Sequence, residues 1–414
     1  MLTFGLLPGP REVKKHRINH FLSPIIDELI ELWDGYELPD SSGKRIRLAV
    51  ICCSNDIPAA RKLCGHISAL AACHRCYKQA TGDEGQRPNF SGFNDMSSWF
   101  IMRDPDEHRQ NAASWLHCRT EDERKNHVSS TLARKSEMLR LPYHDPIRHL
   151  VVDPMHCLFL GIAHWIVKRL WVNSGKITKP QLEEMEKKMK LIKLPSDLGR
   201  IPNKISIGEG FSGFTADQWK TFILVYTTPL LWNILRNSDQ KILSNFVRAC
   251  FLLTLRIIDN NALNEAHSRL LEVAVLIEEN YRLEFITPNI HLSLHLAECC
   301  RDYGPLHSFW CYSFERMNGI LGRQLMIFQI MKFTGFNLTF ILIGSLPNSR
   351  RNIEPELLRI IMQNWRLDNL ISDQLDNSKL EESLNLIQSR PTVESLAAYD
   401  EFEFDELRRF LDIY

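Results

Sequence analysis

The chain has 414 residues, with 50 basic and 50 acidic side chains and a formal net charge of zero. This balance gives no global electrostatic attraction to nucleic acid, so any DNA contact would depend on local basic patches. No apolar stretch is long enough to span a membrane, residues 1–10 lack the pattern of a signal peptide, and eleven cysteines without a regular spacing indicate a reducing compartment.

The N-terminal part is predicted to contain one strand–helix unit. Residues 17–33 carry apolar positions at helical spacing, which predicts an amphipathic helix. Residues 47–53 form a short apolar run between polar flanks, which is typical of a buried strand. A loop follows and opens into a helix with Pro58 near its first turn. Residues 80–130 are polar, and we expect loops and short helices there.

The remainder is predicted to be mostly helical. Asp153 and Pro154 are suited to the N-cap and the first residue of a helix that runs to about residue 171. The sequence from Thr215 to Gln218 is a capping box, which predicts a helix over about 216–236. Further helices are expected at 240–257, at 262–282, from Thr287 through His295, at 309–328, and in the tail from about 346.

Two metal-binding half-motifs lie far apart in the chain. Cys73 and Cys76 form a Cys-x-x-Cys pair, which is typical of zinc sites or redox chemistry but also arises from buried structural cysteines. His291 and His295 are four residues apart, so a helix would place both imidazoles on one face, although two packed histidines would give the same pattern. Together they are a closed Cys₂His₂ set for structural Zn²⁺, with no open position for water. Such an ion would tie together both ends of the intervening segment.

Two acidic residues lie just outside these half-motifs. Asp56 follows the apolar run, either as a carboxylate at a strand end or as a helix N-cap, which the local sequence favours. Glu315 lies in the expected helix and could be an ordinary surface residue. However, it shares a face with Asn318, Gly319 and Gly322, and two glycines inside a helix cost about 1 kcal/mol each relative to Ala. That cost makes sense if another group approaches the backbone closely.

Asp153 and His156 form a third local arrangement, Asp-Pro-Met-His. Helix capping accounts for Asp153. His156 could donate a hydrogen bond to a phosphate or a carboxylate, or could simply pack.

With these residues and spacings, the sequence resembles the CACTA (En/Spm-type) cut-and-paste DNA transposases, particularly the fungal copies. The resemblance extends from residue 1 to about 350, and its most specific blocks are Asp-Pro-Met-His and Phe-Glu-Arg. The matching segments are 7–10, 25–29, 55–59, 73–76, 153–161 and 310–316.

The resemblance implies a DDE/DDD recombinase, in which two Asp and one Glu hold two divalent ions, Mg²⁺ or Mn²⁺. These ions activate water and then a DNA 3′-hydroxyl for phosphoryl transfer. Asp56 matches the second acid and Glu315 the third, while Asp153 and His156 match an Asp-x-x-His motif. The residues that match the structural zinc ligands are Cys73, Cys76, His291 and His295.

The implied fold is α/β with a large all-α insertion: a partial RNase H-like core interrupted by a mostly helical domain. Residues 1–70 would be the first part of that core, and residues 71–300 the insertion closed by the zinc site. Residues 301–345 would be the core's C-terminal helix, and residues 346–414 a helical tail. The resemblance also implies transposon-end DNA as the partner and a nuclear location, allows a homo-oligomer, and involves no membrane.

One departure from the family pattern affects the expected activity. The first family Asp should lie on a strand well upstream of Asp56, but the preceding acids lie in helix or loop contexts: Glu12, Asp27, Glu28, Glu31, Asp34, Glu37 and Asp40. We therefore expect a transposase remnant that lacks its first catalytic Asp and is inactive alone. The alternative is a non-catalytic, zinc-stabilised module that binds DNA or protein, with basic clusters at 119–135 and 349–351.

Overall fold

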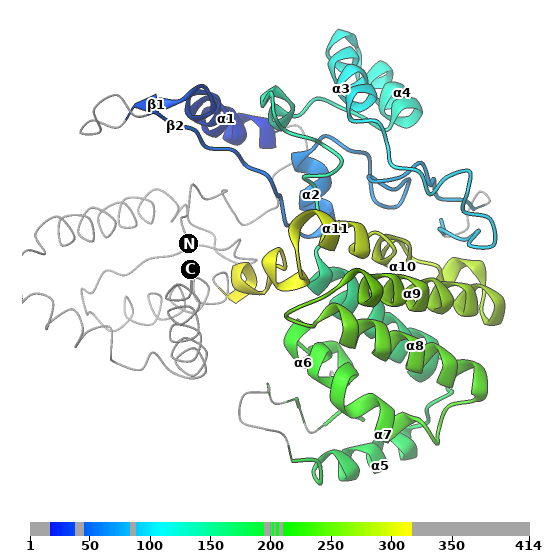
Figure 1. The fold of residues 1–414 in the computed structure, drawn as a ribbon. Helices are drawn as coiled ribbons and strands as arrows, with labels where there is room; N and C mark the ends of the chain where they lie inside the picture. The colour runs from blue at the N-terminus through cyan, green and yellow to red at the C-terminus, as the bar shows by residue number, and fades with distance from the viewer. Residues whose placement is uncertain are drawn as a thin grey trace, which may run out of the picture. The chain divides into compact units, whose positions relative to one another are not determined.

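Helices dominate the part of the chain that the structure describes. The computed structural model describes residues 17–37, 45–82, 88–193, 199, 201–202, 204–206 and 210–316, and Figure 1 shows them as a coloured ribbon. Nearly all of them belong to one compact unit, Val13–Ile192 together with Arg200–Arg316. None of the described helices combines the length and apolarity needed to cross a membrane.

The N-terminal helix forms where the apolar spacing predicts it. Helix α1 (Ile18–Asp34) buries Ile26 and Leu29, and Gly35 ends it with a φ of +110°, a backbone angle that residues with a Cβ rarely adopt. Two short strands follow, β1 (Tyr36–Glu37) and β2 (Arg45–Ile46), and they pair antiparallel. This ribbon is the one sheet found among the described residues.

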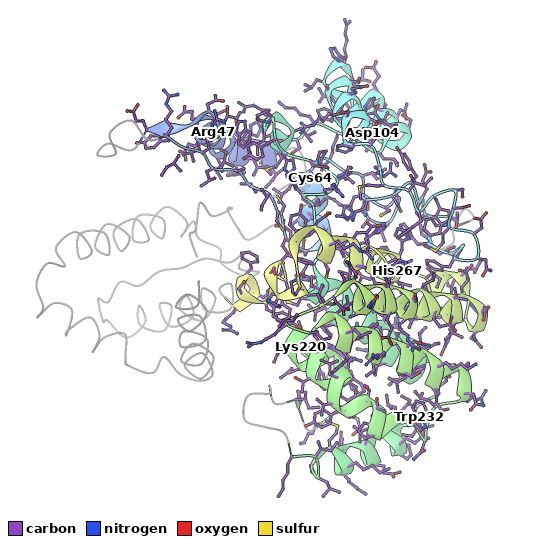
Figure 2. All side chains as sticks on the ribbon, viewed as in Figure 1. Arg47, Cys64, Asp104, Lys220, Trp232 and His267 are labelled. Carbon is purple, nitrogen blue, oxygen red and sulfur yellow. The ribbon has the colours of Figure 1, made fainter. Side chains whose placement is uncertain are left out.

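The prediction of a buried strand at 47–53 is wrong. Residues 47–52 form no strand, and only Cys53 makes a bridge, parallel to Leu150, with its amide 2.7 Å from the carbonyl of His149. Ile51 is 61% exposed, and Figure 2 shows Arg47 on this same segment. An apolar run indicates a strand only where neighbouring strands pair with it. The described residues supply one bridge there, so the RNase H-like core stays a prediction.

A small core forms where this segment turns into helix α2 (Ile57–Leu63). Asp56 is the N-cap of α2, and its Oδ1 accepts from the Ala59 amide at 2.7 Å. The apolar residues of this core come from α1, α2 and the chain around residues 138–150. They are Ile26, Leu29, Cys53, Ala60, Cys64, Met138, Leu141 and Leu150.

Residues 80–130 contain loops and short helices, as their composition predicts. Helix α3 (Pro105–Ser114) begins after Asp104, whose side chain accepts from two amides of the first turn. Helix α4 (Glu121–Thr131) begins with a capping box formed by Thr120 and Glu123. Both helices therefore begin where a side-chain oxygen satisfies the free amides.

The helix predicted after Asp153 is present, but its hydrogen bonding is π-helical, which gives more residues per turn than an α-helix. It consists of two π-helical stretches, η3 (Met155–Ala163) and η4 (Trp165–Val172). π-Helical geometry usually occupies a single turn and is frequent at functional sites. Helix α5 (Lys179–Met189) follows after a turn.

A helical layer completes the unit. The capping box at Thr215 begins α6 (Ala216–Thr221), which continues through η6 (Phe222–Tyr226) and α7 (Thr227–Leu231), so this helical stretch ends earlier than predicted. Helices α8 (Asn237–Leu253) and α9 (Asn260–Asn280) lie within three residues of their predicted starts and pack along each other (Figure 1).

The single helix predicted to carry both histidines is in fact two. Helix α10 (Pro288–Ser293) ends before Leu294, and α11 (Leu296–Tyr303) begins after His295. Between them the Leu294 amide bonds the His291 carbonyl at 3.2 Å, a contact between residues three apart that tightens the turn. Helix α10 packs on η3, and α11 packs on α9.

The last predicted helix can be followed only in part. Residues 312–316 are helical. Residues 309–311, where the helix was predicted to begin, are described and are not helical. Residues 317–328 of the predicted helix and the tail from about 346 lie outside the described residues.

Candidate metal centre

The two cysteines of the candidate centre lie on a loop shaped by backbone hydrogen bonds. The Arg75 amide lies 3.3 Å from Cys73 Sγ, the Lys78 amide donates to Cys76 Sγ, and the Cys73 amide bonds the Lys78 carbonyl at 2.8 Å. Amides directed at sulfur stabilise thiolates, which are the metal-binding form of cysteine. Both cysteines are buried.

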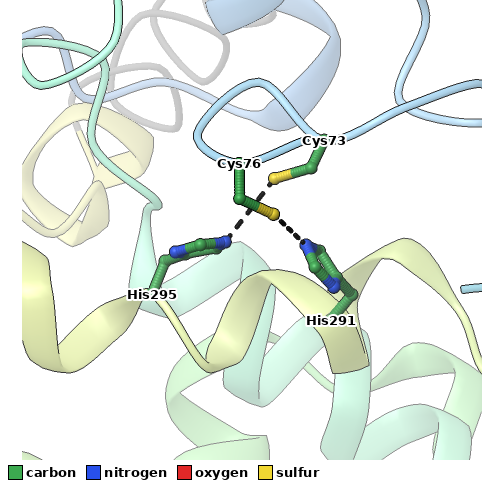
Figure 3. Close-up of side chains that lie close together, drawn as sticks. All are labelled: Cys73, Cys76, His291 and His295. Atoms are coloured by element: carbon green, nitrogen blue, oxygen red, sulfur yellow. Dashed lines mark hydrogen bonds between the residues drawn. The ribbon is translucent and has the colours of Figure 1, made fainter. Parts of the chain in front are cut away.

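The two histidines reach this loop from the turn between α10 and α11. Cys76 Sγ lies 3.3 Å from His291 Nε2, and Cys73 Sγ lies 3.6 Å from His295 Nε2. Figure 3 shows the cysteines on one side and the histidines on the other, with dashed lines joining these pairs. All four ligand atoms lie within 4.8 Å of one another.

This geometry fits a single tetrahedral ion. Zinc bonds of about 2.3 Å to sulfur and about 2.0–2.1 Å to nitrogen place the two ligand atoms about 3.5 Å apart. The observed sulfur–nitrogen distances are close to that value. All four residues are buried, which leaves little access for a water ligand. The cluster could therefore hold a structural metal such as zinc, which would link the segments without supplying chemistry.

The surroundings of the two imidazoles differ. His295 Nδ1 lies 2.9 Å from Glu298 Oε2, the kind of carboxylate contact that orients a metal-binding histidine. His291 Nδ1 is buried and has no hydrogen-bond partner among the described residues. The Phe100 ring stacks on His295 with centroids 4.7 Å apart, and Trp99 lies 5.4 Å from His291. Aromatic rings thus help to exclude water from the ligand set.

The pKa values of the two thiols shift in opposite directions. Burial acts to raise the pKa of Cys73, but the Cys76 thiol and both imidazoles outweigh it and hold the pKa of Cys73 well below its ordinary value. Burial and the neighbouring Cys73 sulfur raise the pKa of Cys76. Metal binding would displace the proton of the Cys76 thiol. The affinity of the site for a metal should therefore rise with pH.

A second cluster lies around Asp153 and His156. Asp153 Oδ2 accepts from the His156 amide at 2.9 Å and from His156 Nδ1 at 2.6 Å, while Oδ1 accepts from the Cys311 amide at 2.8 Å. Atoms of Asp153, His156 and Cys311 are close enough to hold a metal. However, these hydrogen bonds already use both carboxylate oxygens, so the cluster needs no ion. Asp153 thus joins the first turn of η3 to the backbone at Cys311.

The charges of the two acids predicted from the sequence both act on His156. Its Nε2 lies 3.8 Å from Glu315 Oε1. Burial acts to lower the pKa of His156, but the hydrogen bond and charge of Asp153, together with the charges of Glu315 and Asp56, raise it. Asp56 and Glu315 are exposed. The fold therefore brings the charges of both acids near one half-buried imidazole.

A contact further along the chain supports this arrangement. Ser54 Oγ donates to the Phe309 carbonyl and lies 3.3 Å from Cys311 Sγ. The loop that carries Asp56 is thereby attached to the segment that leads into Glu315.

Comparison with known proteins gives one family match. Residues 1–127 match the transposase family tnp2. No curated protein matches the chain. The tnp2 match covers Asp56, Cys73 and Cys76 but ends before the histidines and Glu315. Over these residues the chain is similar to a transposase family.

Sequence reasoning missed two residues next to the metal centre, Arg75 and Glu298. Arg75 lies between the cysteines and its side chain is fully buried, with Nε 3.6 Å from Glu298 Oε2. Arginine and glutamate are ordinarily surface residues, so nothing in their spacing distinguished them. The one available signal was the position of Arg75 inside the Cys-x-x-Cys pair.

Proposed function

We propose that this chain is part of the catalytic region of a CACTA-type DNA transposase of the DDE/DDD class. The observation that carries the proposal is that Glu315 Oε1 lies 3.8 Å from His156 Nε2, and the charge of Asp56, far away in sequence, adds to that of Glu315 in raising the pKa of this imidazole. In this proposal the two carboxylates hold a divalent ion, Mg²⁺ or Mn²⁺. Such an ion supplies Lewis-acid stabilisation and an activated oxygen nucleophile for phosphoryl transfer.

The chain's own residues would prepare that position. Asp153 is buried and holds His156 Nδ1, so the ring presents Nε2 toward Glu315. His156 can thereby orient the Glu315 carboxylate or contact a phosphate oxygen. Ser54 keeps the Asp56 loop attached to the Cys311 segment. We assign Asp56 and Glu315 as ligands, and Asp153 and His156 as their support.

The proposed domain organisation follows from the same assignment. Residues 1–70 and 301–345 would carry the acids of an RNase H-like core, and residues 71–300 would form the helical insertion. The metal centre would lie where this insertion begins and ends, since its ligands come from the 73–76 loop and the 291–295 turn. Transposon-end DNA would be the partner, and the nucleus the place of action.

A divalent-ion titration tests the acidic site. We expect Mn²⁺, followed by electron paramagnetic resonance, to bind the zinc-loaded protein and to bind about tenfold more weakly after Glu315→Gln or Asp56→Asn. Glu184→Gln is the matched control, because Glu184 is an exposed helix residue paired only with Lys188 among the described contacts. Equal Mn²⁺ affinity in all four proteins would refute the assignment.

A second candidate is a zinc-stabilised module that binds DNA or protein without cleaving. Its supporting observation is that, among the described residues, the charges of only two exposed carboxylates act on His156, whereas the resemblance implies a site with three acids. We therefore expect this chain by itself not to cut DNA. A Mn²⁺-dependent nicking assay on terminal-repeat DNA separates the two functions. Nicking that disappears in Glu315→Gln would establish the enzyme, and DNA retention without nicking would favour the module.

A further inference from the structure

Arg75 occupies an unusual position for a charged residue. It lies between the two cysteines of the metal loop in sequence, and its side chain is fully buried. Burying a cation is costly unless hydrogen bonds and opposite charges compensate it. The backbone around Arg75 is fixed by the loop itself, since its amide is directed at Cys73 Sγ and its carbonyl accepts from the Arg103 amide at 2.8 Å. An ion at the cysteines would therefore also fix Arg75.

The guanidinium reaches in two directions. Toward the metal centre, its Nε lies 3.6 Å from Glu298 Oε2, the same oxygen that His295 Nδ1 contacts at 2.9 Å. Away from it, Nη1 donates to the carbonyls of Ile147 at 3.3 Å and Leu150 at 3.3 Å. Arginine suits this arrangement because its planar fork directs several donors at once, which a lysine ammonium cannot reproduce.

The segment held by Nη1, residues 147–153, leads directly to the acidic site. Leu150 forms the parallel bridge with Cys53, and the Val151 amide bonds the Cys53 carbonyl at 3.3 Å. Cys53 immediately precedes Ser54 and the Asp56 loop. The same segment ends at Asp153, which holds His156. Both sides of the proposed acidic site thus begin from backbone that Arg75 supports.

We propose that Arg75 is a positioning residue that couples metal binding at the Cys₂His₂ centre to the geometry of the Asp56–His156–Glu315 site. The second half of this statement rests on the proposed function. The coupling passes from the ion through the cysteine loop and Glu298 to Arg75, and then through the carbonyls of residues 147–150. The ion at the Cys₂His₂ centre does not need to contact Asp56 or Glu315, because residues 147–153 connect Arg75 to the acidic site.

Hydrogen exchange measured by mass spectrometry tests whether Arg75 holds residues 147–153, and it needs neither DNA nor Mg²⁺ or Mn²⁺. In zinc-loaded protein we expect Arg75→Met to accelerate exchange in residues 147–153 by about tenfold, while exchange in α8 and α9 stays unchanged. Glu298→Gln should give a smaller acceleration of exchange in the same segment. This variant replaces Arg75→Met in the test if Arg75→Met does not fold. Arg61→Met is the matched control, because Arg61 is also buried near Cys73 but donates to the carbonyls of Ile67 and Ala72.

Mn²⁺ affinity then tests whether Arg75 affects the geometry of the Asp56–His156–Glu315 site. We expect it to fall about tenfold in Arg75→Met and to stay unchanged in Arg61→Met. Unchanged exchange of residues 147–153 in both Arg75→Met and Glu298→Gln would overturn the coupling, as would an equal acceleration in Arg61→Met. If wild-type protein binds no Mn²⁺, the proposed acidic site fails, while the exchange result still decides whether Arg75 holds residues 147–153 in place.

Discussion

His156 bridges two carboxylates, with Nδ1 2.6 Å from Asp153 Oδ2 and Nε2 3.8 Å from Glu315 Oε1. One carboxylate is buried and close in sequence, whereas the other is exposed and comes from the far end of the described chain. The ring orientation is therefore fixed from the inside by a residue that solvent does not reach. An exposed acid alone could not fix it, because its interactions are screened by water.

Asp153→Ala should be strongly destabilising. The substitution removes both acceptor oxygens and leaves the amides of His156 and Cys311 without these partners. We expect a loss of about 2–4 kcal/mol in the free energy of unfolding, measured by urea denaturation. Asp153→Asn keeps one acceptor and should lose less. A cost below about 1 kcal/mol for the alanine variant would show that Asp153 does not hold this region together.

Removal of the metal should lower the thermal stability sharply. A closed Cys₂His₂ site stabilises the folded state because the unfolded chain does not preform it, and we expect a loss of about 5 kcal/mol or more after chelation. The thermal midpoint should fall by about 10 °C or more. Cys76→Ser should reproduce this loss, whereas Cys118→Ser, a half-buried cysteine outside the cluster, should not. Zinc-free protein with an unchanged midpoint would contradict the site.

Gly161→Ala should disturb the contact between η3 and α10. A Cβ at Gly161 would lie 2.4 Å from Asn289 Nδ2 and 2.8 Å from the His156 carbonyl, which is backbone. Overpacking of this kind costs about 1–3 kcal/mol, which unfolding by urea would measure. Gly175→Ala is the control, because apart from its two chain neighbours no described residue has an atom within 4 Å of its Cβ position, and the left-handed φ of +76° is what opposes the substitution. If the Gly161 variant is the more stable of the two, the packing argument is wrong.

The contribution of Glu137 to stability should disappear in acid. Burial acts to raise the pKa of Glu137, but Arg140 at 2.9 Å and Lys135 at 3.0 Å outweigh it and lower the pKa. A lowered pKa in the folded state gives stability that is complete above the ordinary carboxyl pKa of about 4.3 and is lost as pH falls through the folded value. Glu137→Gln should therefore cost about 1 kcal/mol at pH 7 and less at pH 4. A difference that grows toward acid would have the wrong sign.

The parts of the fold that local chemistry determines could be predicted from the sequence. Thr215 and Gln218 form the capping box that begins α6, and Asp56 caps α2, because capping depends on residues three positions apart. The strand at 47–53 could not be predicted correctly, since pairing depends on distant partners. Ile51 shows the result, because it is apolar and yet mostly exposed.

The candidate site was predictable in its ligands but not in its support. The spacing of His291 and His295 pointed to a shared position, and the two do meet the cysteines, although a turn separates them. The spacing could not show that the Leu294 amide donates to the His291 carbonyl and so ends the first of two helices there. Arg75 was also out of reach, because its role depends on the carbonyls of residues 147–150, which no local pattern connects to it.

The link between Cys76 and His291 has a further consequence. These residues are 215 positions apart, so a bound ion converts more than half of the chain into a closed ring. A single cut inside that ring opens it without releasing a fragment. A protease site placed at the exposed turn of Gly175 should give two pieces that copurify in mild denaturant and separate when a chelator is added. The metal centre would then hold the two pieces of the cleaved chain together, and removal of the metal would release them.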